Sequence, residues 1–216
     1  FGNKRRVNFQ LNDTNNYFFG EALVLPMEVK TSELLQKRSV YVYAEDSINV
    51  YATSMSDSFG LDATIVFPNS ALGREYYIVT RKQALAKTQF LIVAPYDSTR
   101  IEITPTATTE YGKLPNIPFT ITLQRGQTYM VRSNGDLTGS RIRGLGNVNC
   151  RPFAVFTSSP QTSVGDCPVS NFLWEQIPPD AVVGSGYVIP KYPKTSGSII
   201  RALAVHNGTQ IRMDGH

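Results

Sequence analysis

The sequence has little of the residues on which most enzyme chemistry depends. It contains two histidines, two cysteines and one tryptophan among 216 residues. A zinc site ordinarily takes four Cys or His ligands, which these few side chains do not readily supply. Neither a Gly-x-Ser-x-Gly elbow nor a Gly-rich phosphate-binding motif occurs. We therefore predict a chain that is not an enzyme and that holds no metal and no cofactor.

Charged residues and long apolar runs are also scarce. Only 18% of the residues are charged, and 21 basic against 17 acidic side chains give a net charge of +4. The basic residues are scattered in small groups, which disfavours nucleic-acid binding. No stretch approaches the roughly 18 consecutive apolar residues of a membrane-spanning helix, so we expect no membrane insertion. Since the chain opens on Phe1 without a methionine and closes at His216 directly after a strand-like segment, we expect it to be part of a longer protein.

What the sequence does have is strand-like alternation. Short runs rich in Val, Ile, Tyr, Phe and Thr recur from residue 38 onward, whereas no long window shows a helical period. An all-β domain is therefore predicted over 38–216. Strands are expected at 40–44, 48–53, 63–68, 76–80, 90–94, 100–104, 119–123, 128–132, 141–144, 153–157, 186–190, 199–206 and 210–213, with one short helix at 32–36.

A weak internal sequence repeat suggests how these strands are grouped. VYVYAEDSINVYATS at 40–54, FLIVAPYDSTRIEITPT at 90–106 and LAVHNGTQIRM at 203–213 share the form strand, turn, strand. A spacing of roughly fifty to sixty residues predicts a β-propeller-like array of four-stranded units. A β-sandwich or jelly roll built from similar hairpins is the alternative. The N-terminal segment 1–37, with strand-like pieces at 7–11 and 22–25, would close a blade.

The two cysteines and two N-glycosylation sequons bear on the cellular compartment of the protein. Cys150 and Cys167 are expected to form one disulfide if the compartment is oxidising, which would contribute about 3 kcal/mol; two separate buried thiols are the alternative. Asn12 and Asn207 each begin an Asn-x-Thr triplet, the acceptor pattern for N-glycosylation.

The stretch DCPVSNFLWEQIPP at 166–179 concentrates the unusual residues of the chain. Glu175 is the acid that most resembles a catalytic candidate, because Trp174 and Gln176 flank it. The simpler interpretation is structural. Trp174, Glu175, Gln176, Pro178 and Pro179 would then hold a pinned loop on the sheet.

The run from Cys150 to Pro190 resembles the IgGFc-binding protein N-terminal domain family. The matching features are a Pro-hydrophobic-Ala-Val-Phe strand, a Cys-containing loop, a hydrophobic-x-Glu-Gln-hydrophobic-Pro-Pro element and a Gly-x-x-Tyr-Val strand. Here these positions are Pro152, Ala154, Val155, Phe156, Cys167, Glu175, Gln176, Pro178, Pro179, Gly184, Tyr187 and Val188. With PNSALGREYYIVT and ITLQRGQTYMV upstream, the resemblance covers roughly residues 40–215. It implies a secreted or cell-surface, non-enzymatic module.

Three functions follow as hypotheses. The first is a structural or adhesive module that mediates matrix, mucus or surface assembly with other extracellular proteins or glycoproteins, or by self-association. The second is a glycan- or glycoprotein-binding domain in which exposed Tyr and Trp rings stack on sugars. The third is a glycoside hydrolase that uses two facing carboxylates.

Overall fold

The structure, a computed structural model, describes residues 28–56, 60–82, 86–146, 151–163, 171–190 and 199–213. These residues contain strands and two short 3-10 turns, and no α-helix occurs among them, so the all-β class is confirmed. The strands are β1 Leu35–Gln36, β2 Val50–Ser56, β3 Gly60–Val66, β4 Glu75–Tyr77, β5 Thr88–Val93, β6 Thr99–Thr104, β7 Phe119–Leu123, β8 Thr128–Ser133, β9 Arg141–Gly144, β10 Ala154–Thr162 and β11 Asn171–Gln176. The turns are η1 Asn69–Ala71 and η2 Asp180–Val182.

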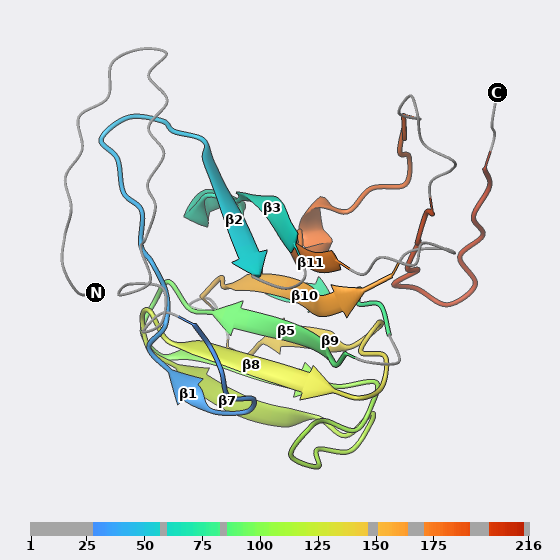
Figure 1. The fold of residues 1–216 in the computed structure, drawn as a ribbon, viewed down its shortest axis with the longest axis horizontal. Coiled ribbons are helices and arrows are strands. Elements are labelled where there is room, and N and C mark those ends of the chain that lie inside the picture. Colours follow the sequence, from blue (N-terminus) through green and yellow to red (C-terminus); the bar gives the residue numbers. More distant parts are fainter. Residues whose placement is uncertain are drawn as a thin grey trace.

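The described residues form three antiparallel sheets. The five-stranded sheet has the order β1-β8-β5-β10-β11, the four-stranded sheet has the order β4-β9-β6-β7, and β2 pairs only with β3. Figure 1 shows the five-stranded sheet in front of the four-stranded sheet, with the β2–β3 hairpin above β10. We call the two larger sheets together the sandwich.

The hydrophobic core lies between the two sheets of the sandwich. Alternate residues of each strand point inward, as the period of two requires. The largest completely or almost completely buried side chains are Tyr76, Ile78, Phe90, Ile92, Ile101, Ile103, Leu123, Leu137, Ile142 and Phe153. Each buried side chain of this size contributes roughly 1.5–3 kcal/mol, so the interface between the sheets holds the fold together.

The connections between strands explain this architecture. The strand–turn–strand run at 90–106 suggests a hairpin, but its turn at Asp97-Ser98 carries the chain from β5 in one sheet to β6 in the other. The turn at Arg125-Gly126 likewise joins β7 to β8 across the sheets, and Gly126 has a φ of +76°. The two turns bind one another, since the Gly126 N–H donates to the Ala94 carbonyl at 2.8 Å. The propeller-like array is therefore not confirmed in the described residues, and the layering is sandwich-like.

The outer face of the four-stranded sheet is polar. Arg141 Nε lies 2.6 Å from Glu75 Oε1, and Arg143 Nη2 lies 2.7 Å from Glu102 Oε1. These ion pairs join β4, β9 and β6 across the sheet. An antiparallel sheet with one wet face shows this pattern of apolar residues inside and charged residues outside.

Several expected elements are absent or different. The expected helix at 32–36 is wrong, since a turn leads there into β1, which pairs with β8. Residues 40–44, 186–190, 199–206 and 210–213 carry strand-like sequence but form no strand in the structure. β11 was not predicted. The expected pieces at 7–11 and 22–25 lie outside the described residues, and the division at residue 37 stays a prediction.

Candidate functional site

Strand β11 carries Trp174, Glu175 and Gln176, three of the five residues that the sequence suggests as a structural motif. Trp174 is half-buried, and its ring stacks on Phe156 of β10 with centroids 5.7 Å apart. Its backbone N–H donates a hydrogen bond of 2.8 Å to Asp62 Oδ2 of β3. Trp174 thus belongs to two interactions at once, one within the five-stranded sheet and one with the hairpin.

Gln176 makes the second connection between β11 and the hairpin. Its side chain is buried, and its Oε1 accepts a 2.8 Å hydrogen bond from the Phe67 N–H. Its own N–H donates to Thr64 Oγ1 at 3.0 Å. The hairpin therefore lies along the edge of β11, joined to it through side chains rather than through a ladder of backbone pairs.

Glu175 points to the other side of β11 and is exposed. Loss of hydration and the negative charge of Asp62 raise the pKa of its carboxyl above the ordinary value. Two carboxylates thus lie near one another across β3 and β11. In the described part of the chain, no basic side chain forms an ion pair with the Glu175 carboxylate.

One of the two prolines after β11, Pro179, lies against Gly73, just before the first strand of the four-stranded sheet. Pro178 is exposed and Pro179 is buried. A Cβ at Gly73 would lie 2.2 Å from Pro179 Cβ, so only glycine allows this approach. Gly73 is also held by Tyr76, whose hydroxyl accepts from the Gly73 N–H at 2.9 Å and donates to the Phe153 carbonyl. Burial raises the pKa of Tyr76 to about 12.

Sequence reasoning missed the partners of this motif. Asp62 and Thr64 occupy alternate positions on β3, which places both on the face toward β11. The strand was expected to begin at residue 63, and this one-residue difference hid the pattern. Two polar residues at positions i and i+2 beside exposed Leu61 and Ile65 were the available signal.

The remaining candidates are the two sequon asparagines and the two cysteines. They lie outside the β11 motif, and only Asn207 is among the described residues. Asn207 is exposed in a turn with Gly208, whose φ is +78°. Thr209, the third residue of that sequon, donates its hydroxyl to the His206 carbonyl at 2.8 Å. Asn12, Cys150 and Cys167 lie outside the described residues.

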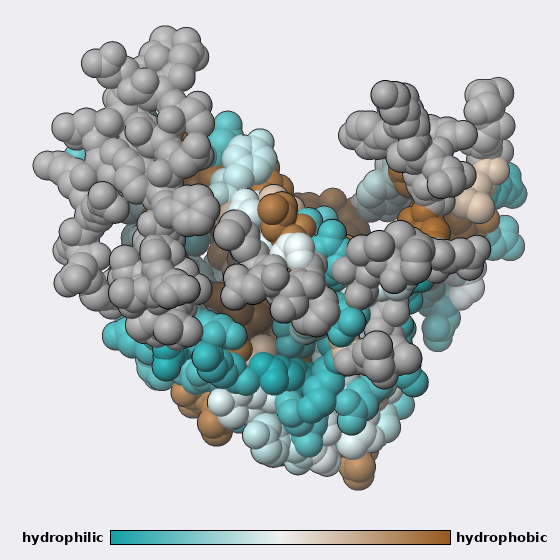
Figure 2. Space-filling view, viewed as in Figure 1, coloured by the Kyte–Doolittle hydropathy of each residue, from teal (hydrophilic) through white to brown (hydrophobic). Residues whose placement is uncertain are grey.

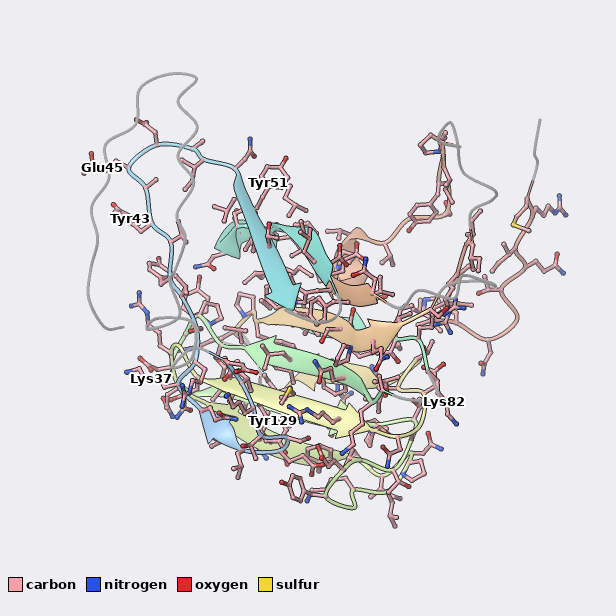
Figure 3. The ribbon with its side chains drawn as sticks, in the orientation of Figure 1. Lys37, Tyr43, Glu45, Tyr51, Lys82 and Tyr129 are labelled. Atoms are coloured by element: carbon pink, nitrogen blue, oxygen red, sulfur yellow. The ribbon has the colours of Figure 1, made fainter. Side chains whose placement is uncertain are left out.

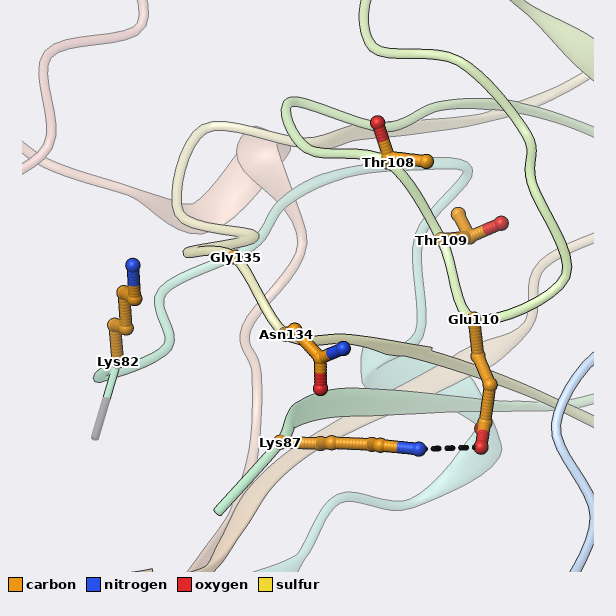
Figure 4. Close-up of a pocket in the computed structure, with 7 residues that line it drawn as sticks. All are labelled: Lys82, Lys87, Thr108, Thr109, Glu110, Asn134 and Gly135. Carbon is orange, nitrogen blue, oxygen red and sulfur yellow. Dashed lines mark hydrogen bonds and ion pairs between the residues drawn. The ribbon is translucent and has the colours of Figure 1, made fainter. Parts of the chain in front are cut away.

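Surface hollows occur on the described part of the sandwich, and two of them stand out. The first, about 480 Å³, is lined by Lys82, Lys87, Thr108, Thr109, Glu110, Asn134 and Gly135. Figure 4 shows Lys87 paired with Glu110, at 2.6 Å, and Lys82 on the opposite side. The second, about 440 Å³, is lined by Ser32, Glu33, Leu34, Tyr111, Lys113 and Tyr129. Each hollow has one carboxylate.

Large apolar side chains are exposed on two projections from the sandwich. We call the β2–β3 hairpin and the described residues 181–190 and 199–213 the flanks. Their exposed members include Tyr51, Leu61, Ile65, Val182, Val183, Tyr187, Val188, Ile189, Ile199, Ile200, Ile211 and Met213. Figure 1 shows both flanks on the same side of the sandwich, and Figure 2 shows brown, apolar residues there above a largely teal lower surface.

The described residues show neither a cluster of metal ligands nor a membrane-spanning helix. Across the described ranges, no three His, Cys, Asp or Glu side chains gather in a way that could hold a metal ion. Nor does any helix in these ranges have the length and apolar character needed to span a bilayer.

Comparison with known proteins gives one match. A family model described as IgGFc binding protein matches residues 62–216, well over half of the chain. No match was found among curated proteins or among solved structures. Members of this family are protein-binding modules, typically extracellular. The matched region begins at Asp62 and contains both β11 and the Glu-Gln-x-Pro-Pro motif. The chain belongs to the IgGFc binding protein family.

Proposed function

We propose that the chain is a non-enzymatic structural or adhesive module of a secreted or cell-surface protein, and that it binds its partners through the flanks. The observation that carries this proposal is the exposure of large apolar side chains on both flanks. Monomeric soluble proteins rarely leave contiguous apolar surface uncovered unless it serves an interaction. The non-enzymatic part rests on the family, which is one of binding modules.

The hairpin presents one apolar face. Tyr51 of β2 pairs with Ile65 of β3, and these two side chains are 71% and 44% exposed. Leu61, on the same face of β3, is also exposed. The opposite face holds Asp62 and Thr64, which bind β11. The apolar face therefore points away from the sandwich and is available to a partner.

The C-terminal flank has the same character. Val188 is 99% exposed and Tyr187 is 70% exposed in a segment without regular structure. Strand-like sequence in an unpaired conformation lacks the neighbouring strand that would cover it. We propose that partner binding supplies this cover, by pairing with residues 186–190 or 199–206.

The proposal is tested by changing the hairpin face without touching the sandwich. The double variant Tyr51→Ser/Ile65→Ser is compared with Thr120→Ala/Thr122→Ala, which alters exposed residues of β7. Self-association is measured by sedimentation velocity, and binding is measured to immobilised mucin and collagen. We expect at least one interaction to weaken about tenfold or more in the hairpin variant alone. Wild-type protein that neither self-associates nor binds either surface would contradict the proposal.

We further propose that Cys150 and Cys167 form a disulfide and that Trp174, Glu175, Gln176, Pro178 and Pro179 act as a structural staple. The bonds of Trp174 and Gln176 to β3 and the contact of Pro179 with Gly73 support the staple. Cys167 lies in the connection between β10 and β11, so a bridge would hold the strands that carry the motif. Mass spectrometry without reduction tests it, and two free thiols would refute it.

A further inference from the structure

The second hollow lies at an edge of the sandwich, apart from the flanks. It is an open depression lined by residues from the turn before β1, from β8 and from the loop of residues 109–118 that precedes β7. Its volume of about 440 Å³ falls within the range of small-molecule sites. Figure 3 shows Tyr129 of this hollow on β8, whereas Tyr43 and Tyr51 stand at the opposite end of the molecule.

Hydrogen bonds hold the walls of this hollow in place. The Glu33 N–H donates to the Met130 carbonyl at 2.7 Å, and the Arg132 N–H donates to Ser32 Oγ at 3.0 Å. The turn is joined to the loop because the Tyr111 N–H donates to Glu33 Oε1 at 3.1 Å. A site whose walls are already ordered loses little conformational entropy when a ligand binds.

Glu33 has an unusual backbone. Its φ of +55° lies in the left-handed region, which costs a non-glycine residue roughly 1–2 kcal/mol. Glycine or asparagine is the ordinary residue there, yet this position places a carboxylate on the hollow. No basic side chain in the described ranges pairs with that carboxylate. Residues kept in such conformations often serve a function.

Lys113 and Tyr129 also line the hollow, and Tyr129 is a core residue that is only 5% exposed. Lys113 lies over the Phe119 ring, with Nζ 5.3 Å from the centroid, and forms no ion pair with any described acid. The ring of Tyr129 packs near Phe119, and burial and the charge of Glu33 raise its pKa to about 12. Tyr129 therefore stays a neutral hydroxyl. That hydroxyl forms no hydrogen bond to the described part of the chain.

An exposed aromatic ring completes the hollow. Tyr111 is 63% exposed although its loop is fixed by hydrogen bonds from Gly112 N–H to the Thr109 carbonyl and from Thr109 N–H to the Lys113 carbonyl. In the described ranges no other ring stacks on Tyr111, so its exposed ring offers an apolar face for stacking.

We propose that this hollow binds a neutral sugar ring. Glu33 would repel an anionic ligand and Lys113 would repel a cationic one, whereas the hydroxyls of a sugar suit both. A sugar hydroxyl can donate to Glu33 while others accept from Lys113 and Tyr129, and the apolar face of the ring stacks on Tyr111. This activity goes beyond the proposed assembly function, which uses the flanks and not this hollow.

The experiment is an NMR titration of the whole 216-residue chain, labelled with ¹⁵N. The probes are the methyl glycosides of glucose, galactose, mannose, fucose and N-acetylglucosamine, and the reporter is the Tyr111 amide, which contacts Glu33. We expect a saturable shift of this amide with at least one glycoside. Tyr111→Ala and Glu33→Gln should each weaken binding about tenfold, while Tyr111→Phe should retain it.

The matched control is Tyr43→Ala, which removes an equally exposed ring far from the hollow and should leave the affinity unchanged. Failure of every glycoside to shift the reporter would overturn the proposal. So would equal affinity in Tyr111→Ala, or a saturable response to acetate or methylguanidinium alone. Because Tyr51→Ser/Ile65→Ser should not alter sugar binding, failure here is distinguishable from failure of the assembly proposal.

Discussion

Apolar side chains are buried in the sandwich but exposed on the flanks. Tyr76 and Phe153 are fully buried between the sheets, whereas Tyr51 is 71% exposed and Val188 is 99% exposed. Composition does not cause this difference, because both regions are rich in Val, Ile and Tyr. The sandwich has two sheets that cover one another, whereas each flank presents a surface that nothing in the described structure covers. The sandwich therefore covers its own apolar residues, whereas the flanks leave theirs open to a partner.

The two regions also differ in how their strands are attached. Within the sandwich, β5 pairs with β8 over six residues and with β10 over five through backbone hydrogen bonds. The hairpin is held on β11 by Asp62, Thr64 and Gln176 side chains. Fewer bonds hold the hairpin, so we expect it to open more easily than the sandwich.

The largest effect is expected from Phe153→Ala. The Phe153 side chain is fully buried, with its ring centroid 5.1 Å from that of Tyr76, so its removal leaves a cavity between the sheets. We expect a loss of about 3–5 kcal/mol in the free energy of unfolding, measured by urea denaturation. Tyr51→Ala is the control and should change it by less than about 0.5 kcal/mol. Equal losses in both variants would erase the distinction between the two regions.

Alkaline pH should act on the sandwich through Tyr76. Its folded pKa of about 12 lies above the ordinary value of 10.0, so its stabilising contribution is complete below pH 10 and is lost as the pH rises toward 12. The expected loss is roughly 2–3 kcal/mol. Tyr76→Phe should cost about 1–2 kcal/mol at neutral pH and flatten this decline. Tyr129, whose pKa is also about 12, should account for the remainder. An unchanged pH profile in the variant would show that Tyr76 is not responsible.

The attachment of the hairpin should fail before the sandwich does. Asp62→Ala removes the acceptor of the Trp174 N–H, which we expect to favour local opening by about 1–2 kcal/mol. Hydrogen exchange at the Trp174 amide should accelerate accordingly, while the Ile92 amide of β5 should keep its protection. Asp46→Ala, at an exposed position before β2, is the control. If Ile92 lost protection together with Trp174, the hairpin and sandwich would form one cooperative unit.

The smallest effect is expected at Glu175. Its carboxyl has a raised pKa, so its protonated form is favoured in the folded state and ionisation is mildly unfavourable above that pKa. Glu175→Gln should therefore raise stability at neutral pH by a few tenths of a kcal/mol, because solvent screens this exposed group. The gain should disappear at acidic pH, where Glu175 is already neutral. Chemical denaturation at both pH values would detect the difference, and a loss of stability at neutral pH would refute it.

Particular strands show how far the sequence could be interpreted. The expected bounds 119–123 and 141–144 match β7 and β9 because apolar and polar residues alternate clearly there. β11 was missed because its outward residues include Leu173 while its fully buried residue is Gln176, which inverts the usual pattern. The second hollow, which we propose binds a sugar, could not be predicted from the sequence because Glu33, Tyr111 and Tyr129 come from three separate segments. Their proximity depends on the turn that binds β8.

The sequence by itself determined the all-β class, the positions of most strands in the sandwich and the family resemblance in the Glu-Gln-x-Pro-Pro motif. These depend on residue type and short spacing, which a linear sequence contains. Only the tertiary structure decided that the turns at Asp97-Ser98 and Arg125-Gly126 join different sheets, and which apolar residues stay exposed. A strand–turn–strand sequence is compatible with a hairpin or with a passage between layers, and the choice depends on which distant strands compete for the same edge.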